Sequence, residues 1–112
     1  MLTFEKILAG FKSYLDEDTR YEVLTASRGY VILEWGSTNK TLESATFCPT
    51  PEVMKEALLN ALEGYLEYKI TLCNRNLTDE ERQRIQDQGE KMDDSIRLKS
   101  RRLYARQTLR RR

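Results

Sequence analysis

Apolar residues recur at helical spacing from the start of the chain. They fall at positions i, i+3, i+4, i+7 and i+11, occupied by Phe4, Ile7, Leu8, Phe11 and Leu15. This stripe predicts an amphipathic helix over Thr3–Leu15, with Thr3 as its N-cap. An acidic run at residues 16–18 then ends the helix.

Two short runs rich in β-branched and aromatic residues follow, Tyr21–Ala26 and Tyr30–Trp35. The segment Ser27–Gly29 between them is typical of a hairpin turn in which Gly29 supplies the positive φ. After a second break at residues 36–40, Thr41–Cys48 predicts a third strand. Because it is more polar, we expect it at an edge of the sheet.

A strong helix start follows the third strand. Thr50 is placed as N-cap and Pro51 as the first helical residue. Apolar positions then recur to about Asn74, at Met54, Leu58, Ala61, Leu62, Tyr65, Leu66, Leu72 and Cys73. They predict a helix that covers the sheet.

A third helix is predicted after a break at residues 75–77. Thr78 and Glu81 form a capping box at its start. The apolar positions beyond it are sparse: Ile85, Met92, Ile96 and Leu103. So thin a seam buries the helix only if a partner covers it, whether the body of the same chain, a second copy or another molecule.

The element order predicts an α+β fold: an N-terminal helix, a three-stranded antiparallel meander, a covering helix, and a long C-terminal helix with a basic end. We expect two parts, an acidic α-β-β-β-α domain over residues 1–76 and a C-terminal helix with an Arg-rich extension over residues 77–112. The length of 112 residues fits one small domain with an extension.

Charge divides the chain unevenly. From Ser95 onward there are eight cationic side chains and no carboxylate, which leaves residues 1–94 with a net charge of −7 in a chain of net +1. The cations are Arg97, Lys99, Arg101, Arg102, Arg106, Arg110, Arg111 and Arg112. Seven of them are Arg, whose planar guanidinium binds phosphate and carboxylate oxygens through paired hydrogen bonds. These eight residues are the predicted polyanion-binding site.

The tail also suits a helix, because apolar residues are interleaved with the cations and no Pro or Gly follows Gly89. Three anionic partners are open: nucleic acid phosphate, DNA or RNA alike; an acidic protein surface; and an anionic membrane surface.

Little in the sequence points to catalysis. The chain has no histidine, which removes the commonest general base and zinc ligand. Carboxylate pairs such as Asp79 with Glu80 and Asp93 with Asp94 lie in polar contexts where both groups ionise. No glycine belongs to a nucleotide-binding motif. We expect no enzyme, no catalytic residue, no metal site and no cofactor.

Cys48 and Cys73 are expected to be reduced, half-buried thiols. No apolar run is long enough to span a membrane and no signal peptide is recognisable, so the expected location is the cytoplasm.

Two other surfaces carry weaker signals. Tyr21, Tyr30 and Trp35 could stack nucleic acid bases, but cross-strand packing beneath the helices is the favoured interpretation because few cations lie near them. Tyr65 and Tyr68 with Glu63 and Glu67 form a solvated helix face in the favoured interpretation, and a protein-binding surface in the other.

The element order of helix, three strands and two helices is similar to that of some small phage-encoded inhibitors of CRISPR nucleases. Many of those inhibitors are acidic DNA mimics, and the +8 tail departs from that character. The resemblance implies a mobile-element protein that inhibits a protein target.

The leading hypothesis is a non-enzymatic binding protein whose basic C-terminal helix engages nucleic acid or a nucleoprotein complex while the acidic body docks on protein. The alternative is a protein-interaction module, or a mobile-element inhibitor, that binds its target without nucleic acid. A homodimer is compatible with either.

Overall fold

The computed structural model describes residues 2–36, 38, 40–72 and 74–110, and the side chains of residues 98–110 fall outside that description. It contains α1 (Phe4–Glu17), β1 (Tyr21–Ala26), β2 (Gly29–Trp35), β3 (Leu42–Cys48), α2 (Pro51–Thr71) and α3 (Asp79–Arg110). The expected α+β order is confirmed.

The helix starts are those that the sequence predicts. The Thr3 hydroxyl accepts the Lys6 N–H at 3.2 Å, and the Thr50 hydroxyl accepts the Val53 N–H at 3.3 Å. The end of α2 comes earlier than Asn74, because Leu72 adopts a left-handed conformation with φ 51° and closes the helix through its N–H on the Tyr68 carbonyl.

The sheet is an antiparallel meander in the order β1-β2-β3. Gly29 has the expected positive φ, and a Cβ there would clash with the Cys48 carbonyl oxygen. β3 begins at Leu42 rather than Thr41, and a bulge at Glu43 shifts its register opposite Glu34 and Trp35.

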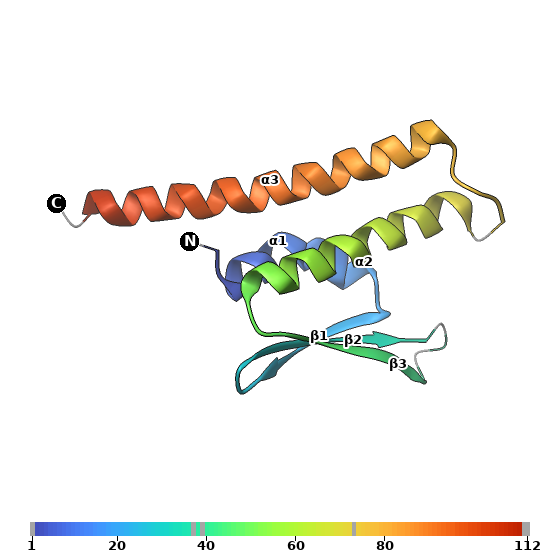
Figure 1. The fold of residues 1–112 in the computed structure, drawn as a ribbon, viewed down its shortest axis with the longest axis horizontal. Helices are drawn as coiled ribbons and strands as arrows, with labels where there is room; N and C mark the ends of the chain where they lie inside the picture. Colours follow the sequence, from blue (N-terminus) through green and yellow to red (C-terminus); the bar gives the residue numbers. More distant parts are fainter. Residues whose placement is uncertain (1, 37, 39, 73, 111–112) are drawn as a thin grey trace.

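Three layers follow from these elements (Figure 1). The sheet forms one layer, α1 and α2 lie together on one of its faces, and α3 crosses the far side of that helix pair. One apolar cluster joins the layers and includes Phe11 of α1, Ile32 of β2, Leu58 of α2 and Ile96 of α3. No described helix is long and apolar enough to cross a membrane.

As far as its side chains are described, the thin seam of α3 is covered by the body of the same chain, and Leu103 lies outside those side chains. Ile85 and Ile96 are buried, and Met92 packs against the cluster. Gly10 brings α1 close to α3, since a Cβ there would lie 2.8 Å from Cγ1 of Ile96. Gly89 does the same for α2 and α3, where a Cβ would lie 2.6 Å from Oε1 of Glu63. The interruption of the helical pattern at Gly89 therefore marks a helix crossing.

The predicted domain boundary at residues 76 and 77 raises the question of how much of α3 the body needs in order to fold. Because Ile96 belongs to the core, loss of its side chain can be compared with loss of the residues after Arg97. We expect Ile96→Ala to lower the free energy of unfolding by about 2 to 5 kcal/mol, the usual range for emptying a buried aliphatic site. A chain ending at Arg97 keeps this contact and should keep its thermal midpoint. Differential scanning calorimetry on both variants measures this, and loss of the cooperative transition in the shortened chain would show that residues 98–112 belong to the core.

Candidate functional site

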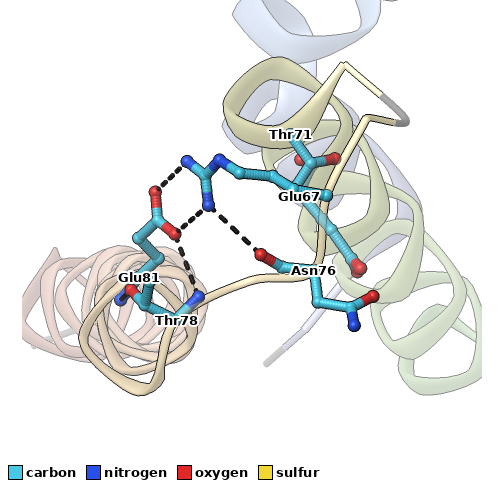
Figure 2. Close-up of polar contacts among 6 residues, drawn as sticks. Glu67, Thr71, Asn76, Thr78 and Glu81 are labelled. Carbon is cyan, nitrogen blue, oxygen red and sulfur yellow. Dashed lines mark hydrogen bonds and ion pairs between the residues drawn. The ribbon is translucent and has the colours of Figure 1, made fainter.

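The connection between α2 and α3 sets the starting direction of α3. The Thr78 N–H donates to the Glu81 carboxylate at 3.0 Å and the Glu81 N–H donates to the Thr78 hydroxyl at 3.2 Å, so the predicted capping box is confirmed. Arg75 adds two guanidinium bonds to the same carboxylate, at 2.7 and 2.8 Å. Figure 2 shows Glu81 and Thr78 joined at this helix start, with Asn76 beside them.

The Glu81 carboxylate is strongly acidic as a result. Hydrogen bonds from Arg75 and then from the Thr78 backbone lower the pKa of Glu81 to about 2. Since a charged carboxylate at a helix N-terminus also suits the helix dipole, the ionised form is the one that holds the α2–α3 connection.

A second polar contact joins α3 to α2 further along the helix, at Asp93. Lys55 of α2, with only 5% of its side chain exposed, places its Nζ 2.7 Å from the Asp93 carboxylate. Arg97, one turn later on α3, binds the other oxygen of Asp93 at 3.1 Å. Burial by itself raises the pKa of Asp93, but Lys55 and Arg97 outweigh it and hold the pKa below its ordinary value.

Arg97 is the first of the predicted cationic residues and follows Asp93 by one helical turn. Arg97 is 57% exposed and shares Asp93 with Lys55. α3 continues as a helix to Arg110, and its last turns extend past the ends of α1 and α2 (Figure 1). The remaining predicted site residues lie outside the described side chains: Lys99, Arg101, Arg102, Arg106, Arg110, Arg111 and Arg112.

The three aromatic residues weighed for base stacking do not share a face. Tyr21 and Tyr30 pack against the core beneath the helices, where the Tyr30 ring lies 4.6 Å from that of Phe4. Tyr21 pairs with Glu34, so Tyr21 and Tyr30 share the face of the even-numbered residues of β2. Trp35 lies on the opposite face, where its indole N–H donates to Glu22 at 3.1 Å. Packing beneath the helices therefore accounts for both tyrosines.

The acidic and aromatic residues of α2 are also divided between neighbours. Glu63 lies against Gly89 of α3. Tyr65 packs on the Tyr14 ring of α1 at 5.6 Å, beneath the ammonium of Lys69. Only Glu67 and Tyr68 remain exposed. The four residues therefore do not form one exposed surface of carboxylates and aromatic rings.

A cavity of about 320 Å³ lies beside Tyr65 and Tyr68, with Asp18, Arg20 and Gly64 also in its lining. Its buried carboxylate is committed to local structure, because Asp18 accepts the Tyr14 hydroxyl at 2.7 Å and the Arg20 N–H at 3.3 Å. Burial and then the Asp18 carboxylate raise the pKa of Tyr14 well above its ordinary value.

Within the described residues, no group of three His, Cys, Asp or Glu side chains could hold a metal ion. Cys48 is a buried free thiol whose pKa is raised by burial, and Cys73 lies outside the described residues.

The sequence interpretation missed an apolar surface on the uncovered face of the sheet. Strand alternation places Leu24, Val31, Leu33, Trp35 and Phe47 there, opposite the helices. Leu24 is 43% exposed and Phe47 is 50% exposed. The signal was present in the central strand, because the unbroken apolar run Tyr30–Leu33 is typical of a strand covered on both faces.

No protein family, curated protein or solved structure matches the chain.

The buried Lys55–Asp93 pair gives a first prediction for this region. Asp93→Asn should lower the free energy of unfolding by about 3 kcal/mol, since it leaves the buried Lys55 ammonium with only Glu56 at 3.9 Å. Lys55→Met combined with Asp93→Leu removes both charges of the pair and should be nearly neutral. Urea denaturation compares them, and equal losses in the two variants would mean that the pair itself stabilises the fold.

The Glu81 carboxylate gives a second prediction. Its folded pKa of about 2 lies below the ordinary value of 4.5, so its stabilisation is full above pH 4.5 and is lost as the pH falls toward 2. Glu81→Gln should therefore flatten the fall in stability over this interval, whereas Glu80→Gln, at the exposed neighbouring position, should not. Chemical denaturation at several pH values measures both slopes, and parallel curves for Glu81→Gln and the unaltered protein would refute the assignment.

Proposed function

We propose that this protein is a non-enzymatic binding protein whose basic C-terminal end of α3 engages nucleic acid, free or within a nucleoprotein complex, while its body docks on protein. The observation that carries the proposal is the geometry of α3. The helix is fastened to the body as far as Ile96 and continues to Arg110 past the end of the helix pair. The cationic segment begins at that last described anchor.

Charge supports a phosphate ligand. The segment from Ser95 onward has a charge of +8 and no carboxylate, and residues 1–94 have a net charge of −7. A polyanion is attracted to one end of α3 and repelled by the body, so the charges favour binding along the helix extension. As a helix, the segment 95–110 is about 24 Å long at about 1.5 Å per residue, a length that spans several phosphates.

The expected recognition is indifferent to base sequence. Arg and Lys contacts to phosphate position a protein on nucleic acid but carry no sequence information. The aromatic residues that would add base stacking are packed in the core or lie on the opposite side of the sheet from the helices. Both DNA and RNA fit this chemistry.

The protein-docking half of the proposal draws on the uncovered sheet face. Its apolar side chains lie together on three adjacent strands, and contiguous exposed apolar surface on a soluble protein marks an interaction site more often than chance. This surface and the basic end of α3 lie on different parts of the molecule, so both can be occupied at once.

The second candidate function is a protein-interaction module, or a mobile-element inhibitor, that uses no nucleic acid. The apolar sheet face favours it, since nucleic acid binding has no need of that surface. In this case the tail pairs with acidic protein surface.

Salt dependence tests the proposal. If about five of the eight cations contact duplex phosphates, the logarithm of the binding constant should fall against the logarithm of salt concentration with a slope of about −4 to −5. Arg101→Ala with Arg102→Ala should weaken binding to every sequence and reduce the slope by up to about two units. Fluorescence anisotropy over a salt series measures both quantities.

A matched control lies on the same helix. Arg82 and Arg84 are exposed in the part of α3 that packs on the body, and replacing both with Ala changes the net charge equally. This control should keep the slope of the unaltered protein. Absence of binding at low salt, or binding that is insensitive to salt, would exclude the nucleic acid ligand and leave the protein-interaction module.

A further inference from the structure

The outer edge of β3 is an open strand edge. β3 is the last strand in the order β1-β2-β3, and among the described residues only β2 pairs with it. All of its side chains except that of Cys48 are exposed. Such an edge presents main-chain donors and acceptors to any extended chain that approaches.

Main-chain hydrogen bonds show which way the residues of β2 face. The Trp35 N–H donates to the Arg20 carbonyl beside β1 at 2.7 Å, and the Gly36 N–H donates to the Thr41 carbonyl beside β3 at 2.8 Å. Because successive residues of an antiparallel strand bond to opposite sides, the even-numbered residues of β2 bond toward β3.

The register then identifies the outward residues of β3. Even-numbered residues of β2 are paired as Tyr30 with Cys48, Ile32 with Thr46 and Glu34 with Ser44. Ala45 and Phe47 lie between these pairs and direct their N–H and C=O groups away from the sheet. Glu43 lies in the bulge at the other end of the strand.

β3 has few of the features that protect natural sheet edges. The strand Leu42–Cys48 contains no proline and no lysine, and its one charged residue is Glu43.

We propose that a second copy of this chain pairs with the outer edge of β3, strand against strand and antiparallel, about a two-fold axis at Thr46. The two three-stranded sheets then form one continuous six-stranded sheet. This inference is independent of the proposed nucleic acid binding, since it does not use the tail.

The sequence of β3 fits this register on both sides of the sheet. Ala45 of each copy faces Phe47 of the other, so both outward residues find main-chain partners and the large ring lies over the small side chain. Thr46 faces Thr46 on the helix side, a pair of hydroxyls. Glu43 faces Pro49, which lacks an N–H, so the ladder ends there and no two carboxylates face each other.

A second copy matches this edge better than an unrelated peptide, because the same short segment supplies both partners of each pair. A lone strand pair buries less than the roughly 1,200 to 2,000 Å² of a stable interface. The dimer should therefore dissociate on dilution.

Sedimentation velocity on the full chain, after nuclease treatment and in high salt, tests the inference. High salt removes pairing of the basic tail with an acidic body, whereas strand pairing persists. We expect a dimer whose fraction rises with concentration. Ala45→Lys should raise the dissociation constant by about tenfold or more, because an edge lysine blocks strand addition, and Thr25→Lys on β1 serves as the matched control.

Amide hydrogen exchange supplies the second measurement. The amides of Ala45 and Phe47 should be protected at high concentration and exposed on dilution, whereas those of Ser44 and Thr46, bonded to β2, should stay protected throughout. A protein that is monomeric at every concentration overturns the proposal. So does a dimer that Ala45→Lys does not weaken, or one in which the Ala45 and Phe47 amides exchange freely.

Discussion

The contact of Ile96 with the helix pair determines where the rest of α3 lies relative to the body. α3 has few apolar residues, so its position depends on a small number of close contacts rather than on a broad hydrophobic stripe. Gly10 permits the close contact with Ile96, which is 2% exposed, and Gly89 lies where α3 passes the Glu63 side chain of α2. Because Ile96, the last buried residue among the described side chains, lies so far along the helix, the turns that follow it extend past the ends of α1 and α2.

A second constraint is that all three helices lie on one side of the sheet. The central strand therefore has apolar residues on both faces but a helix layer on only one, so Val31 and Leu33 are half-buried and have no described helix over them. A small domain usually avoids such exposure because apolar surface is costly in water. The apolar surface lies on the sheet layer, whereas the basic segment lies at the end of α3 on the other side of the helix pair.

Element identity was predictable because it follows from local signals. Thr3, Thr50 and the Thr78–Glu81 pair cap helices through atoms three residues apart, so spacing alone identifies them. The partner of α3 was not predictable, because the contact of Gly10 with Ile96 joins residues distant in sequence and glycine leaves no hydrophobic signal. The buried Lys55–Asp93 pair was hidden for the same reason, since each residue alone is typical of a solvated helix face. Of the predicted binding residues, the structure describes the side chain of Arg97 alone.

The ion pair with Asp93 distinguishes Arg97 from a solvated arginine. Arg97 already has a carboxylate partner at 3.1 Å, so a phosphate that recruits it must displace an existing contact and gains less than it would from a solvated arginine. Lys55 remains on Asp93 when this happens, and α3 therefore stays docked. In the proposed complex, a phosphate bound at Arg97 would therefore compete with Asp93 but would leave the contact between α2 and α3 in place.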